Sequence, residues 1–158
     1  MHVIRPRNKV TKDTLTLQRD AMLLEQNKAL VLNFYEAFDH KDVERGRELM
    51  SANIVGRGMG TDTLNSYDAF LQYGMMMFSA FPDGRHILEE VIAEGDKVVT
   101  RGTFSGTHQG ELMGIPPTGK PVKFSVVHID RIVDGKIVEH WGQGDTFAMM
   151  QQLDVIPM

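Results

Sequence analysis

The spacing of hydrophobic residues predicts helices in the first half of the chain. Residues 13–38 predict a long helix, because apolar side chains recur three or four positions apart. They mark one helical face at Leu23, Leu30, Phe34, Ala37 and Phe38. Residues 42–50 predict a short helix capped by Asp42, and residues 66–80 predict a third helix that Ser66 caps. We expect the first helix to lie across the open side of a sheet.

The second half of the chain has the pattern of β-strands. Residues 85–94 and 97–110 predict two strands joined at Gly95-Asp96, and residues 53–58 a brief strand or loop. Residues 111–121 contain three prolines and two glycines, which cannot continue a ladder of hydrogen bonds. This connection is typical of the rim or lid of a binding site, although a structural corner would explain the composition equally well.

Residues 122–145 predict a long hairpin that turns at Asp134-Gly135, because this dipeptide between two runs rich in Val and Ile is a strong turn signal. If these two residues alone form the turn, Asp130 lies opposite Glu139 and His128 lies opposite Trp141. The first pairing opposes two like charges, which is destabilising.

A bulged turn shifts the pairing by one residue and moves every partner side chain to the other face. We expect this register, in which His128 faces His140 and Trp141 lies on the opposite, convex face. The face that carries His128 then consists of Phe124, Val126, His128, Asp130, Val138, His140 and Gly142.

The order of elements, helices first and antiparallel strands afterwards, predicts an α+β fold with the helices on one face of a curved sheet. Residues 13–158 are expected to form a single domain. Residues 1–12 are basic and aperiodic, and we interpret them as a flexible N-terminal arm, although a basic arm can also bind a polyanion.

Composition narrows the choice of partners. The net charge of −4 and the isoelectric point near 5.8 provide no bulk attraction for nucleic acid or an anionic membrane, and neither partner is expected. No apolar run reaches the roughly 20 residues of a membrane span, and the N-terminus lacks the apolar core of a signal peptide. The absence of cysteine excludes disulfides and thiolate chemistry. A cytoplasmic location is the default expectation.

Residues 107–153 resemble the SnoaL-like polyketide cyclases, or ester cyclases, of the nuclear-transport-factor-two-like superfamily. The resemblance rests on His108-x-Gly110, Gly114-Ile115-Pro116-Pro117-Thr118-Gly119, His128, Asp134-Gly135-Lys136-Ile137, Glu139-His140-Trp141 and Gln151-Gln152-Leu153. It implies a cone-shaped α+β barrel whose curved, mostly antiparallel sheet and concave-side helices enclose an apolar pocket. In that family an intramolecular aldol condensation closes a polyketide ring without a cofactor.

The resemblance also implies a departure in the catalytic set. His128 matches a pocket histidine of the family, but Gly142 stands where those cyclases carry their acid/base aspartate. Asp145 is the nearest carboxylate in sequence that could replace it, although its simplest interpretation is a helix cap. Asp130 and His140 share the face of His128, so these residues are our candidate catalytic groups. A buried structural histidine and solvated sheet-edge residues are the competing interpretations.

We expect a pocket that binds a small hydrophobic molecule beneath the 111–121 connection. Its predicted lining is Tyr35, Phe38, Met113, Ile115, Phe124, Val126 and Gly142. Plain core packing would also explain the aromatic residues, and the methionine-rich run 74–78 either moulds to a ligand or fills gaps in the core.

Other chemistries lack their motifs. His108, His128 and His140 are possible metal ligands, but no close-spaced motif such as H-E-x-x-H is present, and no metal site is expected. No phosphate-binding glycine loop or G-x-S-x-G nucleophile elbow occurs. The remaining classes are a cofactor-independent lyase or isomerase and a non-catalytic binding module.

A homodimer through the sheet face carrying Trp141, or a higher homo-oligomer, is expected. The reason is a group of apolar residues on that face that water would otherwise contact: Val127, Ile129, Ile137 and Trp141.

Overall fold

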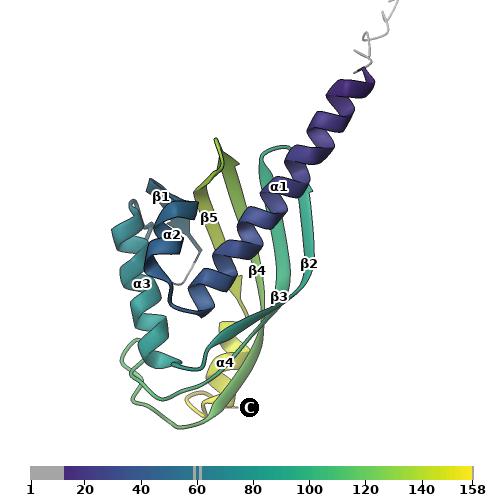
Figure 1. Ribbon diagram of the computed structural model, residues 1–158. Coiled ribbons are helices and arrows are strands. Elements are labelled where there is room, and N and C mark those ends of the chain that lie inside the picture. The colour runs from purple at the N-terminus through teal and green to yellow at the C-terminus, as the bar shows by residue number, and fades with distance from the viewer. Residues whose placement is uncertain (1–12, 59, 61, 158) are drawn as a thin grey trace, which may run out of the picture.

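The computed structural model describes residues 13–157 apart from 59 and 61, and the predicted N-terminal arm lies outside these residues. Helices cover the concave side of a curved sheet of five strands, as Figure 1 shows. The elements are α1 (Thr14–Asp39), α2 (Val43–Leu49), β1 (Met50–Arg57), α3 (Tyr67–Ala80), β2 (Arg85–Glu94), β3 (Lys97–Thr107), β4 (Pro121–Val133), β5 (Lys136–Gly144) and α4 (Thr146–Gln152). The predicted α+β class is confirmed.

Side-chain caps begin the helices at the predicted residues. Asp42 accepts a hydrogen bond from the Arg45 backbone, and Ser66 and Asp145 likewise cap α3 and α4. The long helix α1 begins after a further cap, Asp13. Each cap satisfies a backbone N–H that has no partner within the helix.

The sheet has the order β1-β5-β4-β3-β2, and its only parallel pair among the described strands is β1 with β5. The predicted strand or loop at 53–58 is therefore part of an edge strand that begins at Met50. Strand β3 ends at Thr107 rather than at residue 110, because the backbone N–H groups of Gln109 and Gly110 donate to the Ala80 carbonyl oxygen instead of to a neighbouring strand.

The register of the β4–β5 hairpin differs from both registers considered above. Asp134 and Gly135 both have positive φ, 50° and 71°, and form a two-residue turn that pairs Val133 with Lys136. Val138 is then the extra, unpaired residue of a bulge on β5, because Ile132 pairs with Ile137 but Arg131 pairs with Glu139. The expected bulge exists, but it lies within the strand instead of at the turn.

This bulge corrects the expected pairs while preserving the predicted face. His128 lies opposite Gly142 and not opposite His140, whose partner is Asp130. These four residues, His128, Asp130, His140 and Gly142, still share the concave face. The reason is that a bulge of one residue changes the side to which the following residues point. Trp141 is exposed on the convex face, as predicted.

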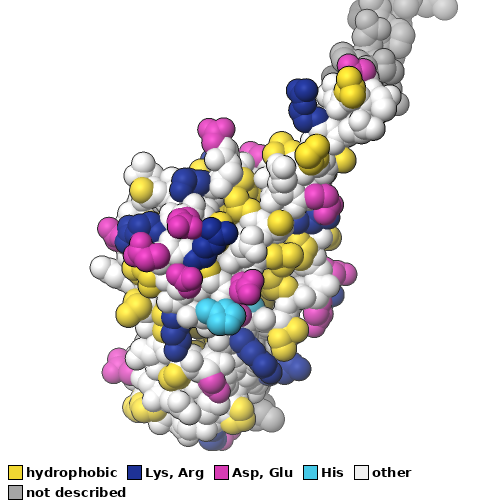
Figure 2. Space-filling view, viewed as in Figure 1, with side chains coloured by type: hydrophobic (Ala, Val, Ile, Leu, Met, Phe, Trp, Pro, Cys, Tyr) yellow, Lys and Arg dark blue, Asp and Glu magenta, His cyan; other side chains and the backbone are white. Residues whose placement is uncertain are grey.

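The positions predicted for the apolar side chains of Ile137 and Leu23 are wrong. Ile137, expected on the convex face, is fully buried because it precedes the bulge. Leu23, expected on the packed face of α1, is 52% exposed because the N-terminal half of this helix extends beyond the sheet, as Figures 1 and 2 show.

Two apolar clusters form the core on the concave side. One joins α1, α3 and β1 to the hairpin through residues such as Phe34, Ile54 and Ile132. The other joins the end of α3 to β3, β4 and α4 around Phe81 and Phe104. In the part of the chain described, no helix has both the length and the hydrophobicity needed to cross a membrane.

Candidate functional site

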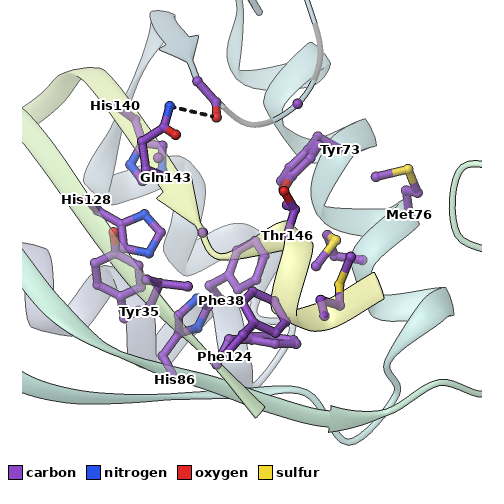
Figure 3. Close-up of a pocket in the computed structure, with 18 of the residues that line it drawn as sticks. Tyr35, Phe38, Tyr73, Met76, His86, Phe124, His128, His140, Gln143 and Thr146 are labelled. Carbon is purple, nitrogen blue, oxygen red and sulfur yellow. Dashed lines mark hydrogen bonds between the residues drawn. The ribbon is translucent and has the colours of Figure 1, made fainter. Parts of the chain in front are cut away.

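A cavity of about 270 Å³ lies between the concave face of the sheet and helices α1, α3 and α4, as Figure 3 shows. Its wall is mainly aromatic and methionine side chains, with a few polar groups on the sheet. This composition is typical of a small-molecule site, in which apolar surface binds the ligand and a few polar groups orient it.

Most of the predicted pocket residues line this cavity. They are Tyr35, Phe38, Met113, Phe124, Val126 and Gly142, together with His128 and His140. Ile115 lies outside the lining, because the connection turns sharply at Met113 and Gly114, both with positive φ. Met76 and Met77 from the methionine-rich run also line the cavity, whereas Met75 is exposed.

His128 lies on β4 at the centre of a cluster of rings. Its ring centroid is 5.1 Å from that of Tyr35, 5.2 Å from that of His140 and 5.7 Å from that of His86. Neither nitrogen of the buried His128 ring has a hydrogen-bond partner among the described residues. Burial, and then the neighbouring His140 and His86, lower the pKa of His128 to about 2. The ring is therefore neutral near pH 7 and can donate one N–H to a ligand.

Asp130 and His140 form a buried hydrogen-bonded pair beside His128. The Asp130 Oδ1 atom lies 2.7 Å from His140 Nδ1, and these residues are 0% and 4% exposed. The interpretation as solvated sheet-edge residues is therefore wrong. The Tyr35 hydroxyl donates a long hydrogen bond, 3.5 Å, to Asp130 Oδ2. Burial and then Asp130 raise the pKa of Tyr35 well above its usual value, so this hydroxyl keeps its proton.

The hydrogen bond to Asp130 determines the state of the His140 ring. An ionised carboxylate can only accept, so we assign the proton to Nδ1, which leaves Nε2 of this pocket-lining ring for a ligand. An imidazole held in this way can take up a proton at Nε2, and the carboxylate compensates the resulting positive charge.

Asp145 lies elsewhere. Its side chain accepts a hydrogen bond from the Ala148 backbone at 2.9 Å and caps α4, and it is outside the cavity lining. Gly142 provides no side chain opposite His128, and Asp130 is the carboxylate that the hairpin places beside His140.

A second pair, Asp39 and His86, was not predicted from the sequence. Asp39 Oδ1 lies 2.7 Å from His86 Nδ1, and the His86 ring lines the cavity. The available signal was weak: His86 alternates with outward-facing residues on β2, but nothing in the sequence indicates that the end of α1 reaches it. No group of three or more potential ligands among the described residues is placed to hold a metal ion.

Comparison with known proteins identifies the family. The family model for SnoaL-like polyketide cyclases matches residues 29–153. The chain belongs to the SnoaL-like polyketide cyclase family.

Relatives and solved structures extend this result. The SnoaL-like chain is 35% identical over 128 residues to the aklanonic acid methyl ester cyclase DnrD of Streptomyces peucetius, a match that covers 78% of this chain and 88% of the relative. It is 41% identical over 68 residues to the nogalonic acid methyl ester cyclase of Streptomyces nogalater, covering 42% of this chain and 51% of that relative.

Solved structures share the fold of this chain. AclR, a putative hydroxylase from Streptomyces galilaeus, is 32% identical with a TM-score of 0.76, and the match covers 85% of each chain. IdmH, a putative polyketide cyclase from Streptomyces antibioticus, is 33% identical with a TM-score of 0.72, covering 82% of this chain and 99% of that structure. The expected SnoaL-like, nuclear-transport-factor-two-like barrel is confirmed.

Proposed function

We propose that this SnoaL-like protein is a cofactor-independent cyclase that closes a ring in a hydrophobic polyketide ester by intramolecular aldol condensation. The observation that supports it best is the buried Asp130–His140 pair beside the neutral His128 in an apolar cavity. Two of its relatives are named as cyclases of aklanonic and nogalonic acid methyl esters, which supports a polyketide ester as the substrate class.

Each polar group has a part in this reaction. His140 Nε2 removes a proton from a carbon next to a carbonyl group, and Asp130 compensates the charge that the ring gains. The neutral N–H of His128 donates to a carbonyl oxygen of the substrate and stabilises the negative charge that develops there. The aromatic and methionine wall binds the apolar rings and excludes water.

The first experiment follows turnover of aklanonic acid methyl ester. His140→Gln removes the base and should lower kcat by about 10²–10⁴-fold, which is the usual contribution of a positioned proton-transfer group. The exposed His40→Gln is the matched control and should retain the rate. Equal turnover by His140→Gln and the unmodified protein would rule out this base.

A non-catalytic binding module is the second candidate, and the glycine at position 142 favours it. Gly142 lies in extended backbone opposite His128, so Gly142→Asp would place a carboxylate beside that ring. If the family-type acid is what the protein lacks, this variant should turn over the ester faster. If the glycine instead makes room for a larger ligand, quenching of intrinsic fluorescence by the ester should show weaker binding and no gain in turnover.

A further inference from the structure

His86 is a second histidine in the pocket wall that a carboxylate holds in place. Its ring packs against Tyr35, Phe38 and Phe104, at centroid distances of 5.1, 5.7 and 5.3 Å. Both oxygens of Asp39 contact His86: Oδ1 lies 2.7 Å from Nδ1, and Oδ2 accepts from the backbone N–H at 2.8 Å. Asp39, the last residue of α1, therefore fixes the position and the orientation of the ring.

The hydrogen bond to Asp39 engages one ring nitrogen of His86 and leaves the other available to exchange a proton. With Nδ1 donating to the carboxylate, Nε2 is the atom that can exchange a proton with a ligand in the cavity. His140 is held by Asp130 through the same ring atom. The pocket thus contains two histidines in equivalent arrangements on different strands, β2 and β5.

His128 lies between these two pairs, as Figure 3 shows. Its ring centroid is 5.2 Å from that of His140 and 5.7 Å from that of His86. A carbonyl oxygen that accepts from His128 would therefore lie between two imidazoles. An aldol ring closure needs two proton transfers, one from a carbon and one to an oxygen, and the two carboxylate-held imidazoles on either side of His128 are placed to perform one each.

We propose that His86, held by Asp39, is the general acid of ring closure, while His140 is the base. This assignment rests on the proposed function. The C–H proton moves to His140 Nε2, and the resulting enolate carbon attacks the ketone carbon. The ketone π bond breaks, and its oxygen takes the proton from His86 Nε2. The substrate gains and loses no atoms, so ring closure is an isomerisation. Proton exchange with water then removes the proton from His140 and returns one to His86 before the next turnover.

The surroundings of the two pairs decide which histidine has which role. An acid must carry its proton before the substrate binds, so its positive charge has to be tolerated in the free protein. The side chains of His86 and Asp39 are 9% and 18% exposed, whereas those of His140 and Asp130 are 4% and 0% exposed. Water reaches the His86 pair and can solvate a charge there, and the end of α1 adds the partial negative charge of a helix C-terminus.

The experiment separates the two proton transfers, using aklanonic acid methyl ester in D₂O. Removal of the carbon proton is measured as enzyme-catalysed incorporation of deuterium into the unreacted ester, and ring closure as formation of the cyclic product. His86→Gln should retain deuterium incorporation and lower ring closure by about 10²–10⁴-fold. His140→Gln should lose both activities, and the exposed His40→Gln should lose neither.

Asp39→Asn gives the same test if His86→Gln does not fold. Its amide would donate to Nδ1 and leave Nε2 as the protonated atom of a neutral ring, so ring closure should fall while deuterium incorporation persists. Ring closure by both variants at the unmodified rate would overturn the role of His86, as would an equal loss of both activities. If the unmodified protein incorporates no deuterium and forms no product, the proposed function fails and the acid assignment fails with it.

Discussion

At the scale of single residues, His128 combines burial, a pKa of about 2 and two ring nitrogens that have no hydrogen-bond partner within the described part of the chain. Leaving a buried polar group without a hydrogen bond costs about 1–3 kcal/mol. Because His128 lines the cavity, a ligand carbonyl that accepts a hydrogen bond from its ring would satisfy one of these nitrogens. Such a residue is expected to favour binding at the expense of stability.

His128 should therefore make the protein less stable in acid. Its pKa in the folded state is below the usual 6.5, so between pH 6.5 and about 2 the unfolded chain binds more protons. The free energy of unfolding should fall by up to about 1.4 kcal/mol for each pH unit below 6.5. His128→Leu should flatten this slope and, at pH 7, raise the free energy of unfolding by about 1 kcal/mol. Urea unfolding between pH 7 and pH 5 measures both effects, and an unchanged slope would contradict the explanation. The exposed His40→Leu serves as control.

The polar groups of the candidate site were predictable only where they share one hairpin. His128, Asp130 and His140 lie within 13 positions of sequence, and the alternation of each strand together with a bulged register placed them on one face. Asp39 and His86 belong to a helix end and a distant strand. Their contact depends on how α1 crosses the sheet, which no local pattern specifies.

At the scale of elements, strands β2 and β3 approach each other closely, and their pairing contains a bulge. Strand β2 contains a bulge at Glu89, because Leu88 pairs with Gly102 but Glu90 pairs with Arg101. A Cβ at Gly102 would lie 2.1 Å from the Ile87 carbonyl oxygen. The glycine thus allows β2 and β3 to approach, two residues beyond the pair that contains His86.

Gly102→Ala should consequently destabilise the protein by about 1–3 kcal/mol, the usual cost of forcing an extra methyl group into packed structure. The matched control is Gly74→Ala in α3, where the new Cβ would meet the Phe38 side chain at 3.3 Å and alanine favours the helix. Thermal unfolding should show a lower Tm for Gly102→Ala than for Gly74→Ala. The reverse order would show that β2 can shift freely.

The elements themselves were largely predictable from sequence, and their registers were not. Caps and hydrophobic spacing located every described helix to within a few residues. The positions of the bulges at Val138 and Glu89 were not predicted, because no residue type marks the unpaired residue of a bulge in the sequence. Like-charge repulsion did indicate that one bulge was needed, and in the structure Arg131 pairs with Glu139 at 3.1 Å instead.

At the scale of the whole molecule, an apolar row crosses the convex face of the sheet. Successive pairing joins Ile92 to Val99, Val99 to Ile129 and Ile129 to Trp141. Ile92, Ile129 and Trp141 are 59%, 39% and 47% exposed. Apolar residues contiguous across four strands are characteristic of an interaction surface.

We propose that a second copy of the chain covers this row in a homodimer. A stable dimer buries about 800 Å² on each partner. Ile129→Lys combined with Trp141→Glu should convert the dimer into a monomer, as measured by static light scattering at micromolar concentration. The control, Met75→Glu, changes an exposed apolar residue on α3 and should leave the molecular mass unchanged. A monomeric unmodified protein would refute the dimer.

The contact between Tyr35 and Asp130 spans 95 positions of sequence, and that between Asp39 and His86 spans 47. Contacts at such separation form late, because the chain must lose much of its freedom before they contribute. The β4–β5 hairpin can bring Asp130 and His140 together by local pairing, but His86 lacks its carboxylate until the end of α1 reaches β2. During refolding, the base pair of the site should therefore form before the acid pair.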